Sequence, residues 1–88
     1  ELGGKSPVIL GRSYDLDKAT ERIMIGKGLN VGQACLAPDY CFVPEERKED
    51  FISSVTEQVA TLFPTMVDNP DYTSVINEKH HRRIVNMI

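Results

Sequence analysis

Apolar and polar positions change along the chain in a pattern that predicts strands and helices in turn. Residues 7–10 form a short continuous apolar run, which is typical of a parallel strand covered on both faces. Apolar residues then recur at three- to four-residue spacing and predict a helix over about residues 16–30, with Asp15 or Asp17 as its N-cap. Residues 39–43 are rich in aromatic and β-branched side chains, and this composition predicts a second strand.

The second half of the chain shows an amphipathic helix, an irregular stretch and a last helix. Pro44 ends the second strand, and a helix is expected over about residues 45–63. Its apolar stripe consists of Phe51, Val55, Val59 and Leu62. An irregular stretch over residues 65–73 precedes a last helix that starts near Asn77. The apolar residues expected to face inward there are Ile76, Ile84, Val85 and Ile88.

The order of these elements predicts the fold class. Strand, helix, strand, helix, helix is the order of an α/β fold, with parallel strands joined by crossover helices. Two strands are too few for a self-sufficient sheet, and three helices offer more apolar surface than two strands can cover. The chain also begins without a methionine and stops inside an apparent helix. We therefore expect a fragment, truncated at both ends, of a larger domain.

Composition and charge exclude several classes of protein. A net charge of -3 argues against a nucleic-acid binder, and the basic residues 79–83 are expected to form a solvated helix face. No apolar run approaches the roughly 18 residues that a membrane span needs. Two cysteines six positions apart do not suggest a disulfide scaffold. The reducing cytoplasm is the expected location.

The two cysteines are the first candidates for chemistry, because a thiolate is a strong nucleophile. A catalytic cysteine needs exposure and hydrogen-bond donors that favour the anion. Cys35 follows a glycine-containing turn, residues 30–34, whose backbone amides can point at a bound oxygen. Cys41 lies in the second predicted strand, where a thiol behaves as a small inert hydrophobe. Position alone favours a structural role for Cys35 and leaves the catalytic role open.

Glu1 is a second candidate, whereas no metal site is expected. A glutamate before paired glycines can be a general base, and Gly3 and Gly4 can let a cofactor approach the backbone. An exposed terminal glutamate without any role is the plain alternative. His80 and His81 are adjacent, so on a helix they point in different directions. The recurring ligand spacing of a zinc site is missing.

Two short motifs together resemble the signatures of one enzyme family. Residues 1–7 (ELGGKSP) resemble the glutamate signature of the aldehyde dehydrogenases, and residues 30–35 (NVGQAC) resemble their cysteine signature. The separation of Glu1 and Cys35 also agrees with the family. Residues 35–40 (CLAPDY) resemble the branch that contains the class 3 fatty and aromatic aldehyde enzymes and the bacterial coniferyl aldehyde dehydrogenases. The similarity covers the whole chain.

The resemblance implies that residues 1–88 are part of the nucleophile-bearing catalytic domain of an NAD(P)-dependent aldehyde dehydrogenase. Cys35 would be the catalytic thiol that carries first a thiohemiacetal and then a thioester. Glu1 would activate the water that hydrolyses the thioester, and Leu2 and Gly3 would lie beside the nicotinamide of NAD or NADP. The implied substrate is an aromatic or hydrophobic aldehyde such as coniferyl aldehyde. The implied partners are the rest of the enzyme chain and, in the parent protein, further copies in a homo-oligomer.

A non-catalytic interpretation stays open beside the enzymatic one. The chain could be an isolated fragment, or a family member that serves a structural or binding role. The family's dinucleotide-binding domain, its oxyanion asparagine and its ribose-binding glutamate motif are absent from these 88 residues. The isolated chain is therefore expected to be inactive, while the parent protein is expected to be an enzyme.

Overall fold

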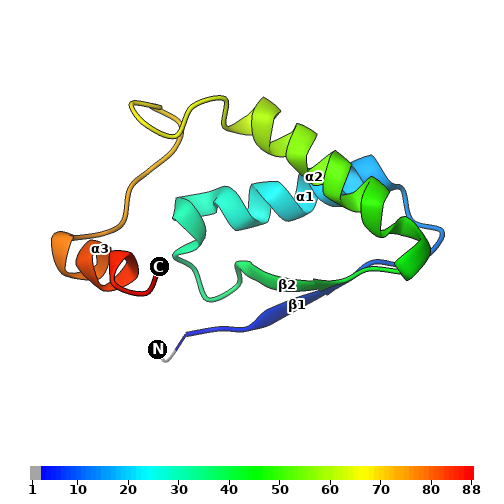
Figure 1. Ribbon diagram of the computed structural model, residues 1–88, viewed down its shortest axis with the longest axis horizontal. Coiled ribbons are helices and arrows are strands. Elements are labelled where there is room, and N and C mark those ends of the chain that lie inside the picture. The colour runs from blue at the N-terminus through cyan, green and yellow to red at the C-terminus, as the bar shows by residue number, and fades with distance from the viewer. Residues whose placement is uncertain (1–2) are drawn as a thin grey trace.

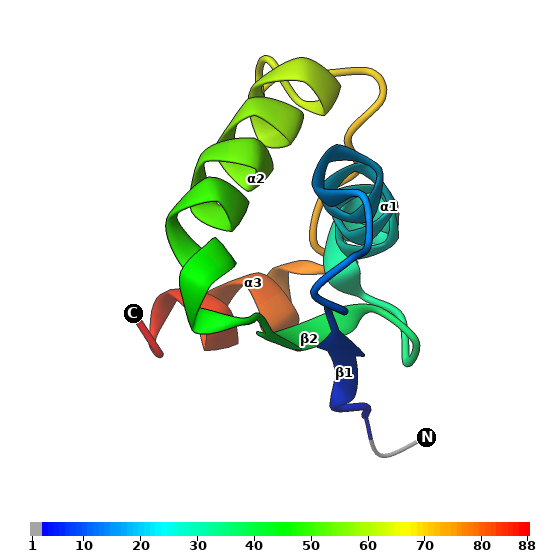
Figure 2. The same ribbon diagram turned by 90° about the vertical axis from the view of Figure 1, so that its right-hand side faces the viewer.

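The computed structural model describes residues 3–88 and shows a strand–helix–strand unit followed by two further helices (Figure 1). Its elements are β1 (Ser6–Ile9), α1 (Leu16–Gly28), the 3-10 segment η1 (Leu29–Gly32), β2 (Pro38–Phe42), the 3-10 segment η2 (Glu45–Arg47), α2 (Lys48–Leu62) and α3 (Glu78–Val85). β1 and β2 pair in parallel, and both α1 and α2 lie on one side of this two-stranded sheet (Figure 2). The predicted α/β class, with parallel strands joined by a crossover helix, is confirmed.

The two strands bury only one face. Val8 pairs with Cys41, and both are partly buried on the side of α1. Ile9 and Phe42 pair on the other side, where they remain 77% and 60% exposed. The prediction of a strand covered on both faces is therefore wrong for the described residues. An uninterrupted apolar run indicates side chains whose burial would be favourable, but it does not show whether another layer covers them.

α1 begins and packs as the sequence predicts. The Asp15 side chain accepts a hydrogen bond from the backbone amide of Lys18 at 2.9 Å, which satisfies one of the free donors of the first turn. Ala19 is buried against the sheet. A Cβ at Gly28 would overlap the ring of Phe63, so a larger residue there would require that ring to move.

A buried polar network fixes α1 against α2. The Thr20 side chain is fully buried, and its hydroxyl lies 2.7 Å from that of Ser54 on α2. The Ser54 hydroxyl in turn donates to Asp17 at 3.0 Å. Asp17, considered as an alternative N-cap, therefore links the helices instead. Because buried hydroxyls need partners, this network favours one alignment of the two helices.

Arg47 binds the connection between β1 and α1. One nitrogen of its guanidinium donates to the backbone carbonyls of Gly11, Arg12 and Tyr14 at 3.2, 3.0 and 2.8 Å. Glu46 forms an exposed ion pair with Arg12 beside it at 2.7 Å. These contacts hold the β1–α1 connection against η2, which the sequence did not reveal.

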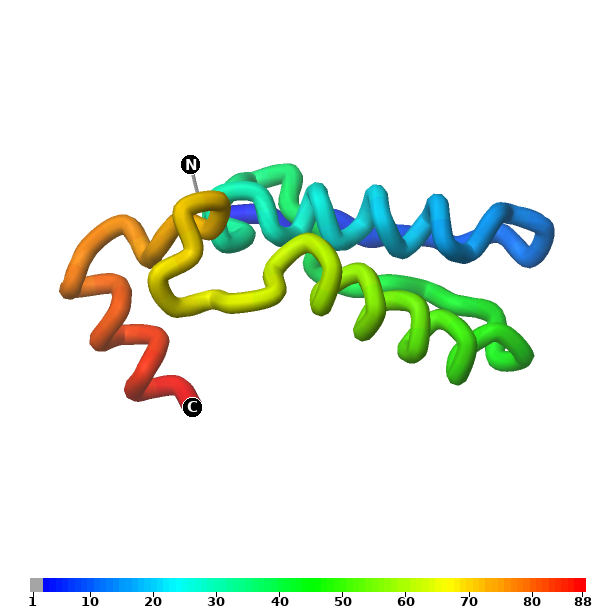
Figure 3. Tube along the Cα trace, turned by 90° about the horizontal axis from the view of Figure 1, so that it is seen from above, coloured from blue at the N-terminus to red at the C-terminus, as the bar shows by residue number. Residues whose placement is uncertain are grey.

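α3 stands away from the sheet and the other two helices (Figure 3). The Asn77 side chain caps it by accepting from the backbone amide of His80 at 3.0 Å, so the predicted start is confirmed. The apolar residues in and beside α3 were expected to face inward, but Ile76, Ile84, Val85 and Ile88 are 76%, 36%, 56% and 103% exposed. That expectation is wrong for the described residues, because these apolar side chains remain exposed. Within residues 3–88 no helix is both long and apolar enough to cross a membrane.

Candidate active site

Cys35 lies in a tight turn directly before β2. The backbone amide of Ala37 donates to the carbonyl of Ala34 at 3.1 Å, and this bond closes the turn around Cys35 and Leu36. The Cys35 thiol is free and exposed, and Leu36 beside it is 82% exposed. The backbone amide of Cys35 makes no hydrogen bond with any described residue. The turn thus offers both a thiol and an unused donor to solvent.

The start of β1 holds this turn from one side. The Ser6 hydroxyl donates to the carbonyl oxygen of Cys35 at 3.3 Å. A Cβ at Gly4 would overlap that same oxygen and would lie 3.1 Å from the carbonyl carbon of Cys35. Since both atoms belong to the backbone, a larger residue at Gly4 could be accepted only if the turn moved. The glycine therefore permits the two segments to approach this closely.

The segment before Cys35 has an unusual backbone. Asn30, Val31 and Gly32 all have positive φ, at 51°, 59° and 74°. The left-handed region is rare for a β-branched residue such as Val31, so surrounding contacts must hold it there. Two of these contacts join Asn30 and Gln33, each side-chain amide donating to the other residue's carbonyl at 3.3 and 3.0 Å. The polar residues of this motif therefore build the turn that presents Cys35.

A surface hollow of about 340 Å³ lies beside the thiol. Its walls are Gly3, Gly4, Gly32, Gln33, Ala34 and Cys35. Gly3 has a φ of 95°, and nothing lies within 4 Å of the position that its Cβ would take. The structure thus brings together Gly3 and Cys35, two of the predicted site residues. The other two, Glu1 and Leu2, lie outside the described residues.

The hollow lies at the amino ends of both strands. Gly4 precedes β1 and Cys35 precedes β2, so the site is built from the segments that lead into the sheet (Figure 1). Ligands of open α/β sheets usually bind at the carboxyl ends of the strands, where Arg47 here donates to the carbonyls of the β1–α1 connection. Strand order alone would therefore have placed a candidate site at the edge of the sheet opposite to Cys35.

Cys41 occupies a different environment. It lies partly buried on the inner face of β2, and this burial raises the pKa of its thiol because a thiolate is poorly solvated there. The positions of the two cysteines agree with the predicted contrast between an accessible and a sheltered thiol.

We expect Cys35 to be alkylated by iodoacetamide well before Cys41 in the folded protein. Cys35 is open to the reagent, whereas Cys41 is sheltered and carries less thiolate at neutral pH. Peptide mass spectrometry over a time course measures both rates. In guanidinium chloride the two rates should converge, since folding causes the difference. Equal rates in the folded protein would contradict this expectation.

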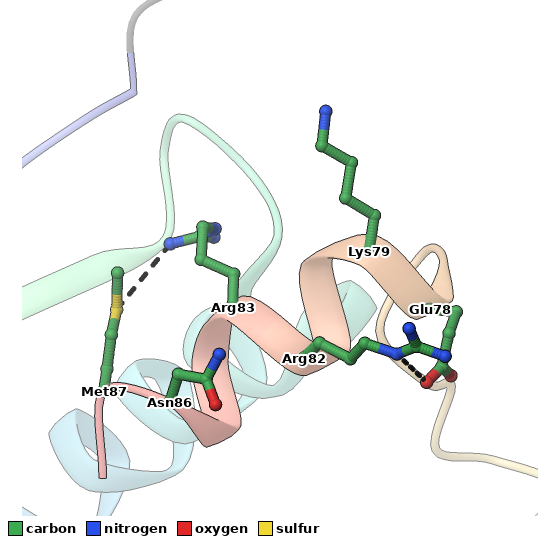
Figure 4. A pocket seen from close by; sticks show the side chains of 6 residues that line it. All are labelled: Glu78, Lys79, Arg82, Arg83, Asn86 and Met87. Carbon is green, nitrogen blue, oxygen red and sulfur yellow. Dashed lines mark hydrogen bonds and ion pairs between the residues drawn. The ribbon is translucent and has the colours of Figure 1, made fainter.

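A larger hollow lies on α3 and has a different character (Figure 4). Its lining residues are Glu78, Lys79, Arg82, Arg83, Asn86 and Met87. Glu78 and Arg82 pair with each other at 2.8 Å, while Lys79 extends away from them into solvent. Residues 79–83 are all exposed, as expected for a basic helix face in solvent. No cluster of three or more His, Cys, Asp or Glu side chains that could hold a metal occurs among residues 3–88.

Comparison with known proteins gives one consistent family. The model of the aldehyde dehydrogenase family matches residues 1–88. The chain is 49% identical over 84 residues to the coniferyl aldehyde dehydrogenase of a Pseudomonas species, covering 96% of this chain and 18% of that protein. It is 38% identical over 89 residues to aldehyde dehydrogenase family 3 member A2 of Rattus norvegicus, covering 100% of this chain and 18% of that protein. A substrate-bound structure of Staphylococcus aureus AldH has a TM-score of 0.86 at 38% identity, covering 99% of this chain and 19% of that chain.

The fold and these matches define a fragment of an α/β dehydrogenase domain. The chain belongs to the aldehyde dehydrogenase family. Within the family its similarity lies with the coniferyl aldehyde and class 3 branch. The chain spans less than a fifth of the length of these relatives, at 18% and 19%.

The sequence did not reveal every residue that shapes the site. Ser6 and Gly4 belong to the ELGGKSP motif, but their contacts with Cys35 depend on the pairing of β1 with β2. Gln33 holds the turn through its bond to Asn30, and its side chain also bonds to residues 74 and 76. No sequence signal marks those two as partners, since their backbone atoms make the contacts.

Proposed function

We propose that residues 1–88 are the nucleophile-bearing part of the catalytic domain of an NAD(P)+-dependent aldehyde dehydrogenase. The observation that carries this proposal is the exposed Cys35 thiol, held on a turn beside a glycine-walled hollow. Family membership supports the same reaction, the oxidation of an aldehyde to a carboxylic acid.

Cys35 is the nucleophile in this proposal. Its thiolate adds to the aldehyde carbon, forming a carbon–sulfur bond and an oxyanion. The backbone amide of Cys35, which makes no hydrogen bond with described residues, would donate to that oxyanion. One such donor is worth roughly 3–4 kcal/mol in a transition state. The thiohemiacetal loses a hydride to become a thioester on Cys35.

The segment around Gly3 would face the cofactor. When bound, NAD(P)+ accepts the hydride that leaves the aldehyde carbon. The hollow of about 340 Å³ beside Cys35 is walled mostly by glycines, and these residues fit the close approach of a flat ring. By resemblance, Leu2 would contact the same ring. Glu1 would take a proton from water, which then hydrolyses the thioester and releases the acid and the free thiol.

The proposed substrate is an aromatic or hydrophobic aldehyde such as coniferyl aldehyde. This follows from the similarity to a coniferyl aldehyde dehydrogenase over 96% of the chain. We further propose a cytoplasmic protein, since both thiols are free, and a homo-oligomer formed by the parent protein.

The test is turnover of the full-length protein that carries residues 1–88. We expect coniferyl aldehyde to yield its carboxylic acid with one reduced cofactor per acid, at a higher kcat/KM than acetaldehyde. Chromatography measures the acid, and an enzyme-coupled assay measures the reduced cofactor. NAD+ and NADP+ are supplied separately. Failure to form acid from any aldehyde with either cofactor would contradict the proposed function.

A further inference from the structure

The chain after α2 returns to the turn that carries Cys35 (Figure 3). Residues 73–76, which we call the strap, lie between the irregular stretch and α3. The Thr73 hydroxyl donates to the side-chain oxygen of Asn30 at 3.4 Å. The backbone carbonyl of Ser74 accepts a hydrogen bond from the Gln33 side-chain nitrogen at 3.1 Å. The backbone amide of Ile76 donates to the Gln33 side-chain oxygen at 2.9 Å. Three hydrogen bonds thus join the strap to the residues that precede the thiol.

Gln33 is the centre of this connection, and its amide is used at both ends. The nitrogen donates to the carbonyls of Asn30 and Ser74, while the oxygen accepts from the amide of Ile76. Only a side chain with a donor and an acceptor on one planar group satisfies all three. Two of these partners lie 41 and 43 positions away, so the contacts are tertiary rather than local.

The strap matters because the turn has few other supports. Asn30 and Val31 have left-handed backbone conformations, which need surrounding contacts to persist. On the opposite side, Ser6 holds the carbonyl of Cys35. The turn is held by β1 through Ser6 and by the strap through Gln33, so two separate segments define its position. A loss of either support would let the thiol shift by a distance that matters for bond formation.

We propose that Gln33 is a positioning residue for the reaction, which fixes the Cys35 turn by anchoring it to the strap. This role rests on the proposed function of Cys35 as the nucleophile. In this role Gln33 does not contact the reacting atoms. It acts through the turn, and residues 73–76 become part of the catalytic framework although they contribute no chemical group.

The first experiment replaces Gln33 by glutamate and by leucine in the full-length protein. In Gln33→Glu the second carboxylate oxygen faces the carbonyls of Asn30 and Ser74 and repels them. Gln33→Leu removes both the donor and the acceptor. We expect kcat for the aldehyde to fall at least about tenfold in both variants, with a smaller change in KM for the cofactor, because positioning affects bond formation more than cofactor binding.

The pH profile separates positioning from a general loss of structure. As pH falls toward the carboxyl pKa, unperturbed near about 4.3, protonation returns a donor to Gln33→Glu. The ratio of its kcat to that of the wild-type protein should therefore rise at low pH, whereas the ratio for Gln33→Leu should stay low. Gln58 on α2 is the matched control, since its side chain makes no hydrogen bond with described residues. Gln58→Glu should retain wild-type kcat.

Hydrogen exchange gives a second readout that does not depend on activity. Among the described residues, the hydrogen-bond partner of the Ile76 amide is the Gln33 side chain, and Ile76 itself is exposed. Peptides that contain the strap should therefore exchange faster in Gln33→Leu than in the wild-type protein. Wild-type kcat in both Gln33 variants, or unchanged exchange, would overturn the role of Gln33. If the role of Gln33 is overturned but Cys35→Ala abolishes turnover in the same assay, the proposed function still stands. If Cys35→Ala stays active, the proposed function itself fails.

Discussion

Replacement of Cys35 by alanine is expected to abolish aldehyde oxidation by the full-length protein. The loss should reach at least about 10⁴-fold in kcat, as is typical when a covalent nucleophile is removed. Cys41 is not expected to substitute for it, because Cys41 is sheltered on the inner face of β2 and burial raises the pKa of its thiol. Rapid-quench and steady-state measurements of reduced cofactor give the first-turnover and steady rates.

Two further variants separate the role of Cys35 from those of Cys41 and Glu1. Cys41→Val keeps an apolar side chain on the inner face of β2 and should retain turnover. Glu1→Gln should keep the thiol but lose the base that activates water. It should therefore release reduced cofactor in one rapid turnover and then stall at the thioester, whereas Cys35→Ala shows no such burst. Normal turnover by Cys35→Ala would sink the assignment of the nucleophile.

Replacement of Gly4 by alanine should reduce turnover without removing any reactive group. The added Cβ would overlap the carbonyl oxygen of Cys35. Neither atom belongs to a flexible side chain, so the turn and its thiol must shift. A displacement of about 1 Å can cost on the order of 100-fold in rate, and we expect a loss of kcat of that size. Steady-state kinetics of the full-length protein measure it.

Gly11 provides the matched control for this substitution. It lies after β1 at the opposite end of the strand, and nothing lies within 4 Å of its Cβ position. Gly11→Ala should leave kcat unchanged. Alkylation of the Gly4→Ala variant should still favour Cys35, since the thiol is displaced but not buried. Unchanged kcat in Gly4→Ala would show that the close approach of the two segments is not needed for catalysis.

The starts of α1 and α3 could be predicted because their causes are local. Asp15 and Asn77 cap helices through bonds to amides three positions along the chain. The periodic apolar residues of α1 and α2 lie on the sides where these helices meet each other and the sheet. Capping and periodicity involve only residues close together in the chain, so they can be recognised from the sequence.

Covered surfaces could not be predicted from the same patterns. Ile9 and Val85 are as apolar as buried residues elsewhere, yet they are 77% and 56% exposed. An apolar side chain indicates that burial is favourable, but whether a partner lies against it depends on distant parts of the fold. The relatives are more than five times as long as this chain, at 18% coverage, which fits apolar faces that need further layers.

The sequence by itself determined the family, the order of the elements and the residues that could carry chemistry, Glu1 and Cys35. These properties lie in short motifs and local periodicity. Only the tertiary structure decided that Gly4 and Ser6 contact the Cys35 backbone, and that Gln33 is tied to the strap. Those contacts join residues 29 to 43 positions apart, and most involve backbone atoms that every residue possesses. Spacing along the chain therefore carries no sign of them, whereas folding brings them within bonding distance.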